Sequence, residues 1–255
     1  MDVLAELLRR TPSFKGKGRI VSHWLRTRRG QRARILPGGL EIPLDMSVPY
    51  EAMIWIGWEE QEELHALRQL LHSGETFIDC GANIGLWSLV AAPMVWPNGR
   101  VVAFEPNPSV AKRLAEAAVQ SSVIEVHAMA LSDKPGVLQL AAGREHNLAR
   151  INSEGARSVP ATTLDAVLER RPDGIKIDVE GYELKVLNGA VEALSHRPWI
   201  IVEFNKQHSA ALRLAEWAVH EHLTDLGYRA HTVGGERLAD EWTPKYGYAN
   251  VLYQV

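Results

Sequence analysis

The spacing of apolar positions divides most of the chain into short strands and helices. Compact apolar runs bounded by glycine, proline or charged residues predict five core strands, at residues 76–80, 100–104, 123–129, 174–179 and 198–204. Between these runs apolar residues recur at helical spacing, as in Leu64, Leu67, Leu70 and Leu71. Two more runs predict closing strands at residues 228–232 and 248–253. Strands that alternate with helices predict an α/β fold.

Turn and cap signals mark several boundaries. Residues 34–44 alternate around Pro37-Gly38-Gly39, which predicts a hairpin between two short strands. Pro93 follows a helical pattern and is expected to kink or end that helix. Asn107 followed by Pro108 predicts a helix N-cap and the first helical position.

Other local patterns predict smaller features. Thr162 with Asp165 resembles a capping arrangement for a short helix, and residues 136–142 alternate like an added hairpin strand. The polar insert at residues 143–158 is predicted to be either a substrate lid or a plain surface loop. Helical spacing predicts packed faces near the N-terminus and late in the chain, at residues 3–8 and at Leu184, Leu187, Val191 and Leu194.

One stretch, TFIDCGANIGLW at residues 76–87, predicts a strand, a tight turn and a helix. Gly81 and Gly85 in the turn let backbone approach a ligand where a Cβ would collide. The helix N-terminus behind Ala82 and Asn83 offers unpaired N–H groups to a polar or anionic group. This unit is typical of nucleotide-binding α/β sheets.

Two acids favour S-adenosylmethionine as the ligand of this turn. The glycine spacing G-x-x-x-G does not match the dinucleotide pattern G-x-G-x-x-G. Asp79 at the end of the first strand would repel a pyrophosphate, but it can pair with an ammonium group. Glu105 follows the second strand, 20 positions after Gly85, where an acid can accept hydrogen bonds from ribose hydroxyls. S-adenosylmethionine has an ammonium, a ribose and no phosphate.

A second group of charged residues ends the fourth and fifth strands. In IKIDVEG, strand alternation places Lys176, Asp178 and Glu180 on one side. Glu203 ends the next strand and is expected beside them. Charged groups are costly to bury unless they pair or work, and ligands of open α/β sheets lie at this edge. We interpret the group as catalytic, with Asp178 as its main member; a structural ion-pair network is the alternative.

Several ordered segments resemble the FkbM family of S-adenosylmethionine-dependent methyltransferases. They are GWEEQE (57–62), FIDCGANIGLWSL (77–89), VVAFEPNP (101–108), ALSD (130–133), IKIDVEGYELKVLNGA (175–190) and IIVEFN (200–205). The resemblance covers about residues 40–205, with a weaker match near 248–253. It implies methyl transfer and a class I methyltransferase, Rossmann-like α/β fold. The implied sheet has seven strands, mostly parallel with an antiparallel closing strand, and has helices on both faces and a small N-terminal cap.

The resemblance also implies further contacts with the methyl donor. The segment around Glu59 approaches the cofactor or the substrate in the family, although a helix-start carboxylate favoured by the helix dipole is the alternative. Ala130, Leu131 and Asp133 follow the third strand, where this fold class usually places the adenine. For Asp133 a plain polar turn is the alternative interpretation.

A carboxylate cluster suits methylation of a hydroxyl, which needs help to lose its proton at neutral pH. Asp178 is expected to orient the hydroxyl and take the proton, and Glu203, Glu180 or His208 can share that role. Together with this cluster, the resemblance to the FkbM family implies a small molecule, natural product or glycan as the acceptor, with S-adenosylhomocysteine as the second product. The acids can also hold a divalent metal, but the sequence has no recognisable metal-ligand spacing, and none is predicted.

The basic residues between Arg9 and Arg34 leave two alternatives open. They suggest N- or O-methylation of a peptide or RNA, or they form a solvated surface over the catalytic domain. The net charge of −3 argues against a general nucleic-acid binder. A non-catalytic protein that binds the same cofactor is a third class, which the full set of acids disfavours.

Length and composition describe an ordinary globular protein. A chain of 255 residues can bury one sizeable core, so we expect an N-terminal cap at 1–71 and a methyltransferase domain at 72–255. The single cysteine, Cys80, rules out an internal disulfide and is expected to be buried. There is no apolar run of membrane-spanning length and no secretory signal, so a cytoplasmic location is expected. The oligomeric state has no signal in the sequence.

Overall fold

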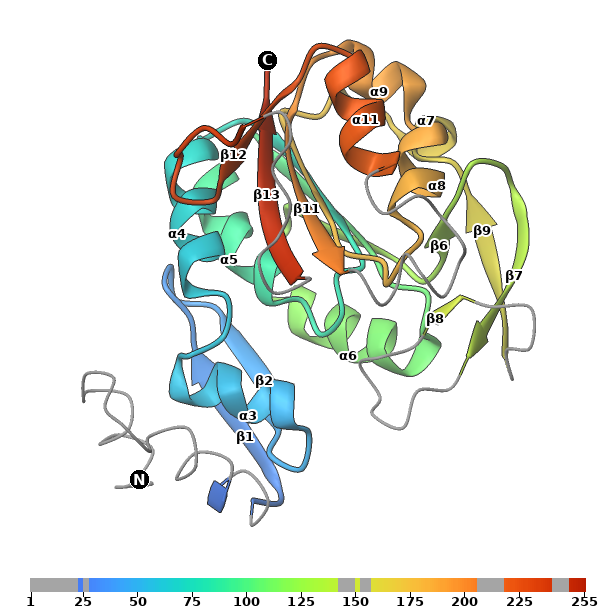
Figure 1. The fold of residues 1–255 in the computed structure, drawn as a ribbon. Helices are drawn as coiled ribbons and strands as arrows, with labels where there is room; N and C mark the ends of the chain where they lie inside the picture. Colours follow the sequence, from blue (N-terminus) through green and yellow to red (C-terminus); the bar gives the residue numbers. More distant parts are fainter. Residues whose placement is uncertain (1–22, 25–27, 142–149, 152–156, 206–217, 240–247) are drawn as a thin grey trace.

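The computed structural model describes residues 23–24, 28–141, 150–151, 157–205, 218–239 and 248–255 (Figure 1). The helix expected at residues 3–8, most of the basic N-terminal stretch and His208 lie outside these residues. Among the described residues, no helix has both the length and the apolar character needed to cross a bilayer.

A seven-stranded sheet forms the centre of the protein, in the order β12-β13-β11-β10-β3-β4-β5. Its strands are β3 (Thr76–Cys80), β4 (Arg100–Phe104), β5 (Ile124–His127), β10 (Gly174–Ile177), β11 (Trp199–Asn205), β12 (Arg229–Thr232) and β13 (Tyr248–Gln254). The five strands β3, β4, β5, β10 and β11 pair in parallel, and β13 pairs antiparallel with both β11 and β12. The predicted fold class is confirmed, and the antiparallel strand lies between β11 and β12.

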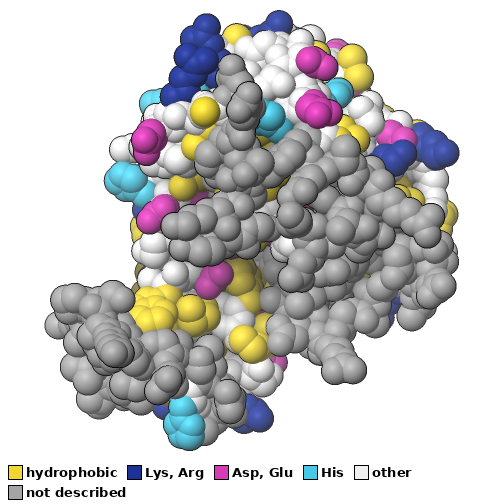
Figure 2. Space-filling view, in the orientation of Figure 1, with side chains coloured by type: hydrophobic (Ala, Val, Ile, Leu, Met, Phe, Trp, Pro, Cys, Tyr) yellow, Lys and Arg dark blue, Asp and Glu magenta, His cyan; other side chains and the backbone are white. Residues whose placement is uncertain are grey.

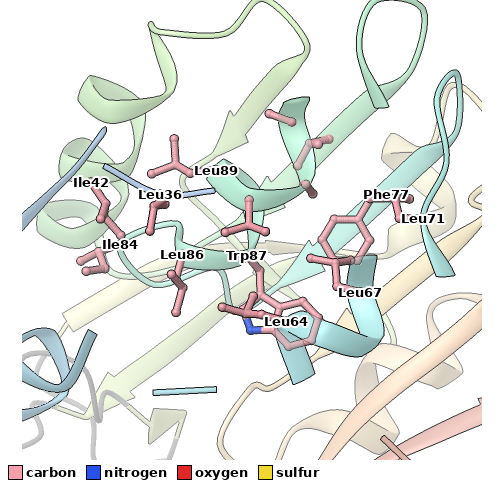
Figure 3. Packing of buried hydrophobic residues seen from close by; sticks show 14 of the residues in the cluster. Leu36, Ile42, Leu64, Leu67, Leu71, Phe77, Ile84, Leu86, Trp87 and Leu89 are labelled. Atoms are coloured by element: carbon pink, nitrogen blue, oxygen red, sulfur yellow. The ribbon is translucent and has the colours of Figure 1, made fainter. Parts of the chain in front are cut away.

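Helices cover both faces of this sheet (Figure 1). They are α4 (Gln61–Leu70), α5 (Leu86–Val95), α6 (Pro108–Ala118), α7 (Leu164–Val167), α8 (Glu183–Asn188), α9 (Val191–Ser195) and α11 (Ala218–Asp225). A further helix, α3 (Pro49–Ile56), lies beside the end of the sheet. Because neighbouring strand residues point to opposite faces, Phe77 packs with α4 and α5 whereas Ile78 packs with α8 and α11. Figure 3 shows the first of these clusters, in which Trp87 of α5 lies beside Leu64 and Leu67 of α4.

The predicted N-terminal hairpin is confirmed as β1 (Gln31–Ile35) paired antiparallel with β2 (Glu41–Asp45). Helix α3, which the sequence pattern did not predict, follows it. This helix begins with Pro49 and ends at Gly57, whose φ of 72° suits a left-handed C-cap. Figure 1 shows the hairpin and α3 beside the end of the sheet toward which the β11 arrow points.

A separate four-stranded sheet, in the order β6-β9-β7-β8, lies between β5 and β10 in the sequence. It consists of β6 (Ala130–Leu131), β7 (Gly136–Ala141), β8 (Arg150–Ile151) and β9 (Arg157–Thr162). Strand β7 confirms the predicted hairpin strand. Most of the insert predicted as a substrate lid or surface loop lies outside the described residues, so its role stays a prediction.

Pro93 does not end its helix, because α5 continues to Val95. The hairpin turn at Gly38 lies against the Pro93 ring, so close that a Cβ at Gly38 would be 2.4 Å from Pro93 Cγ. The Pro93 ring thus packs against the hairpin turn, although proline has no backbone N–H to donate within α5. Asn107 caps α6 as predicted, and its Oδ1 accepts the Ser109 N–H at 3.2 Å.

The predicted capping arrangement of Thr162 with Asp165 is wrong, because neither residue caps the helix α7 that was expected there. Thr163 caps α7, since its Oγ1 accepts the Ala166 N–H at 3.2 Å. The Asp165 carboxylate instead accepts the N–H groups of Glu192 and Ala193, both at 2.9 Å, at the start of α9. A pairing across 27 residues has no local signal in the sequence.

The packed helix expected through Leu184 and Leu194 is two short helices, α8 and α9. The break lies at Gly189, where a Cβ would be 2.0 Å from the Ser132 carbonyl oxygen. The break changes which residues face the core, so Val191 is 69% exposed although Leu187 and Leu194 are buried.

Candidate functional site

The turn after β3 brings three parts of the chain together. Gly81 has a φ of +79°, and a Cβ there would be 1.8 Å from the Asp178 carbonyl oxygen. Gly85 has a φ of +91°, and a Cβ there would be 2.2 Å from Leu114 Cδ1. Both glycines are therefore required by the protein's own packing, in addition to any approach of a ligand. The close contact at Gly81 places Asp178 directly beside the turn.

The first N–H groups of the turn are bonded within the protein. Gly81 and Ala82 both donate to the Phe104 carbonyl oxygen at 2.9 Å, and Asn83 donates to Glu105 Oε2 at 3.0 Å. Asn83 has a φ of 51°, a left-handed value that asparagine tolerates better than most residues. The predicted donor contacts of these residues stay predictions.

Glu105 is held firmly at the carboxyl end of β4. Its two carboxylate oxygens accept the backbone N–H groups of Asn83 at 3.0 Å and Asn107 at 2.7 Å. Burial raises the pKa of Glu105 to about 7, although these two hydrogen bonds oppose the shift. Each oxygen can accept a second hydrogen bond, so the geometry suits the predicted contact with ribose hydroxyls.

Asp79 is fully buried beside a lysine of the neighbouring strand. Its Oδ2 accepts the Ser88 hydroxyl at 2.6 Å, and its Oδ1 lies 3.9 Å from Lys176 Nζ. The register of β3 and β10 pairs these two residues directly. Burial raises the pKa of Asp79, and the Lys176 charge opposes that shift. We expected the donor's ammonium here, and the structure places the Lys176 ammonium there; a donor contact of Asp79 stays a prediction.

Lys176 links the turn to the end of β10. Its Nζ donates to Asp178 Oδ2 at 3.1 Å and to the Gly81 carbonyl oxygen at 3.2 Å, and it lies 5.9 Å from the centre of the Trp87 ring. Burial lowers the pKa of Lys176, but Asp178, Asp79 and Glu60 outweigh burial and raise it above its ordinary value. Lys176 therefore stays protonated and holds Asp178 in place.

Asp178 and Glu203 form a carboxyl pair at the ends of two neighbouring strands. Residues Ile177 of β10 and Val202 of β11 are in register, so the next residues lie side by side as predicted. Burial raises the pKa of Glu203 well above its ordinary range, and the Asp178 charge and the hydrogen bond between the two carboxyls add to the shift. Glu203 is thus protonated at neutral pH, directly beside Asp178.

Glu180 lies just outside the strand. Strand β10 ends at Ile177, and Glu180 has a left-handed φ of 57°, so the alternation that groups it with Lys176 does not extend this far. Its charge contributes to the raised pKa of Glu203. Glu180 therefore belongs to the cluster electrostatically, and its catalytic role stays a prediction.

Sequence reasoning missed four side chains that surround this cluster. The Glu60 carboxylate accepts hydrogen bonds from the Tyr50 hydroxyl at 2.8 Å and from the Trp87 indole N–H. The charges of Glu203 and Asp178, after burial, raise the pKa of Tyr248, which begins β13. The only hint for Glu60 was its place in the GWEEQE segment. Glu59, which the resemblance selects, is half-buried, and burial and Glu63 raise its pKa.

The predicted adenine residues lie at the start of the second sheet. Ala130 and Leu131 form β6, are buried, and pair with β9. The Asp133 carboxylate lies 2.6 Å from Lys185 Nζ and accepts the Ser132 hydroxyl at 3.1 Å. Asp133 is thus tied into the protein surface, and contacts of the three residues with adenine stay predictions.

The chemistry of this edge fits a cationic methyl donor. Acidic side chains converge there from four elements of the sheet and from the α3–α4 turn, and Lys176 balances part of their charge. In the described part of the chain, no group of three or more His, Cys, Asp or Glu side chains is arranged to hold a metal ion. Figure 2, which has the orientation of Figure 1, shows hydrophobic side chains gathered over α3.

Comparison with known proteins agrees with this geometry. The family model for the methyltransferase FkbM domain matches residues 79–230. The chain is similar to the hexuronic acid methyltransferase AglP of Haloferax volcanii, at 29% identity over 157 residues, 57% of this chain and 62% of AglP. It also resembles the crystal structure of methyltransferase FkbM from Methylobacillus flagellatus, with a TM-score of 0.50 and 20% identity, over 71% of this chain and 44% of that one.

The chain spans less than two thirds of the length of each of these two relatives, and the structural likeness concerns the fold alone. The family model, however, covers more than half of the chain, from the end of β3 to β12, and includes the turn and both groups of acids. This chain belongs to the FkbM methyltransferase family.

Proposed function

We propose that this protein transfers a methyl group from S-adenosylmethionine to a hydroxyl of a glycan, natural product or other small molecule. The observation that carries the proposal is the position of the Asp178 carboxylate. It lies between the Lys176 ammonium and the Glu203 carboxyl, at the edge of the sheet where ligands of this fold bind. A member of a methyltransferase family that has a fixed carboxylate at this edge can orient an acceptor and take up its proton.

The donor is held mainly by the first two strands in this proposal. Glu105 accepts hydrogen bonds from the ribose hydroxyls, because its carboxylate is fixed by Asn83 and Asn107. Glu59 and Asp79 supply negative charge toward the ammonium end, and Ala130, Leu131 and Asp133 border the adenine. When bound, S-adenosylmethionine supplies an electrophilic methyl group on a positively charged sulfur.

Asp178 acts as the base of the reaction. The hydroxyl donates a hydrogen bond to the Asp178 carboxylate, which aligns its oxygen and takes its proton as the new carbon–oxygen bond forms. Lys176 donates a hydrogen bond to this carboxylate and holds it in place. Glu203 is neutral beside this carboxylate, because burial and the Asp178 charge raise the pKa of Glu203 well above its ordinary range.

A sugar is the acceptor class that the relatives favour. AglP is named for its action on a hexuronic acid, and this chain is 29% identical to it over 157 residues. Sugars offer several hydroxyls of ordinary acidity, which is the chemistry that needs a base at Asp178. The alternative of a peptide or RNA acceptor depends on the basic N-terminal stretch, most of which lies outside the described residues.

A methyl-transfer assay tests the proposal. Purified protein is incubated with methyl-labelled S-adenosylmethionine and a pool of neutral, acidic and amino sugars, and products are located by their mass shift and by fragmentation. We expect a methyl ether on a sugar hydroxyl and a loss of at least about 100-fold in kcat for Asp178→Ala. Label found only on a peptide or RNA, or a fully active Asp178→Ala protein, would contradict the proposed acceptor or the proposed base.

A further inference from the structure

Glu60 comes from outside the segment that the family model matches, yet it reaches the candidate site. It lies in the turn between α3 and α4, 19 residues before the matched segment begins at Asp79. Its carboxylate accepts hydrogen bonds from Tyr50 at 2.8 Å and from the indole N–H of Trp87. Lys176 and Asp178 are both close enough to affect its ionisation.

The backbone of Glu60 is in an uncommon conformation. Its φ of 52° and ψ of 35° are left-handed values, which most residues with a Cβ adopt only at a cost. The α4 helix begins directly after it, and no side chain caps that helix. A turn built only to start α4 has no need of this conformation, and the Glu60 carboxylate in this turn accepts the Trp87 indole N–H.

Trp87 connects Glu60 to the catalytic cluster. Its ring face lies 5.9 Å from Lys176 Nζ, in the range of a cation–π contact. Lys176 Nζ also donates to Asp178 and to Gly81, so the ring limits a third side of the ammonium. Figure 3 shows the Trp87 ring beside Leu64 and Leu67, and its indole N–H donates to Glu60. This hydrogen bond can therefore help to fix the rotation of a ring that is otherwise held by apolar contacts.

We propose that Glu60 is a positioning residue for methyl transfer, through which the α3–α4 turn orients Trp87, and thereby Lys176 and Asp178. The inference rests on the proposed function of Asp178 as the base. Glu60 touches neither the reacting hydroxyl nor the transferred methyl group. Its effect is on the alignment of the base, so it appears in kcat more than in the affinity for the donor.

Three substitutions separate orientation from simple loss of charge. Glu60→Gln keeps an oxygen that can accept the Trp87 N–H, whereas Glu60→Ala removes it. Trp87→Phe keeps an apolar ring and removes the N–H donor. We expect kcat to fall roughly tenfold or more for Glu60→Ala and for Trp87→Phe, and Glu60→Gln to recover most of the rate. The dissociation constant of S-adenosylmethionine, measured by calorimetry, is expected to stay within about threefold of the unmodified protein's.

A double variant and a matched control complete the experiment. Because Glu60 acts through Trp87, the protein with both Glu60→Ala and Trp87→Phe is expected to be no slower than the slower single variant. Glu62→Ala removes an exposed carboxylate from the first turn of the same helix and is expected to leave kcat unchanged. If Glu60→Ala does not fold, Glu60→Gln and Trp87→Phe still give the comparison.

If the unmodified protein transfers methyl groups, three results would overturn this inference while the proposed function stands. The first is a Glu60→Ala or Trp87→Phe variant as fast as the unmodified protein, and the second is a Glu60→Gln variant as slow as Glu60→Ala. The third is a double variant in which the two losses of kcat multiply. If the unmodified protein transfers no methyl group to any acceptor, the proposed function itself fails and this inference fails with it.

Discussion

Lys176 and Asp79 lie opposite each other on neighbouring parallel strands, both buried, with 3.9 Å between Nζ and Oδ1. The pair is completed by Asp178, whose Oδ2 accepts from the same ammonium at 3.1 Å. One lysine thus ties the strand that carries the glycine turn to the strand that carries the proposed base. Lys176 therefore joins the stability of the fold to the position of the proposed base.

Lys176→Met is expected to destabilise the protein by about 3–5 kcal/mol, because it leaves the buried Asp79 carboxylate without its counter-charge. Urea denaturation at pH 7 measures the loss. Lys185→Met is the matched control, since it breaks an ion pair with Asp133 at 2.6 Å in which the lysine side chain is 44% exposed. That change should cost no more than about 1 kcal/mol. Equal losses for the two variants would show that the buried pair has no special role.

The Asp178–Glu203 pair should make stability fall as pH rises. Burial and Asp178 raise the pKa of Glu203 above its value in the unfolded chain, so the folded protein binds more protons from about pH 4.5 upward. Its contribution is therefore favourable at low pH and declines toward alkaline pH. Glu203→Gln stays neutral at every pH, so it should reduce this decline by about 1–3 kcal/mol between pH 5.5 and 8.

Urea denaturation at both pH values measures that difference. Glu192→Gln, at an exposed position in the first turn of α9, is the control and should leave the pH dependence unchanged. A Glu203→Gln protein with the same pH dependence as the unmodified one would mean that Glu203 is ionised in the folded state.

Gly81→Ala should damage both fold and function. The new Cβ would lie 1.8 Å from the Asp178 carbonyl oxygen at a φ of +79°, so the loop that carries the proposed base must move. We expect a loss of more than about 2 kcal/mol in the free energy of unfolding and a lower kcat. Gly39→Ala has a similar φ of +93° but nothing within 4 Å of the new Cβ, and it should cost only about 1 kcal/mol. If the two variants behave alike, backbone conformation alone explains the glycine at position 81.

Glu105→Gln should weaken donor binding. A glutamine amide has a single oxygen, so it cannot accept the N–H groups of both Asn83 and Asn107 as the two carboxylate oxygens do. The side chain proposed to face the ribose therefore loses its fixed position and its charge. Calorimetry should show the dissociation constant of S-adenosylmethionine rising about 10- to 100-fold, with the melting temperature as a check on folding. Glu116→Gln, whose side chain is 64% exposed on α6, should bind the donor normally.

The same residue predicts a pH dependence of donor binding. Burial raises the pKa of Glu105 to about 7, so its ionised, hydrogen-bond-accepting form is lost as pH falls below that value. Affinity for S-adenosylmethionine is therefore expected to decrease between pH 8 and 6 in the unmodified protein and to change less in Glu105→Gln. Titrations at the two pH values give the comparison, and an affinity independent of pH would argue against Glu105 as a contact of the donor.

The strand and turn patterns were enough to predict the edge of the sheet where the charged residues gather. Strand β4 has the predicted bounds, and Asp178, which directly follows β10, lies beside Glu203 of β11 as expected. Such features depend on the period of a single strand and on parallel pairing, both of which are visible in a short stretch of sequence. The roles of these residues toward donor and acceptor stay predictions.

Partners that are distant in the sequence could not be predicted in this way. Local spacing suggested that Asp165 caps its own helix, but it caps α9, and no local pattern pointed to the contact of Glu60 with Trp87. The glycine at position 81 looked like an adaptation to a ligand, and it also makes room for the Asp178 carbonyl. In each case a side chain or carbonyl arrives from another element, and its arrival depends on how the elements pack.

The sequence by itself determined the α/β fold, the glycine turn and the placing of acids at strand ends, because backbone periodicity and turn chemistry act over a few residues. Only the tertiary structure decided which buried charged groups pair or form hydrogen bonds with which partners. Lys176 reaches the Gly81 carbonyl from 95 residues away, and Glu60 reaches Trp87 across 27 residues. Burial makes an unpaired charge costly, so the packing of separate elements, rather than any local pattern, selects these partners.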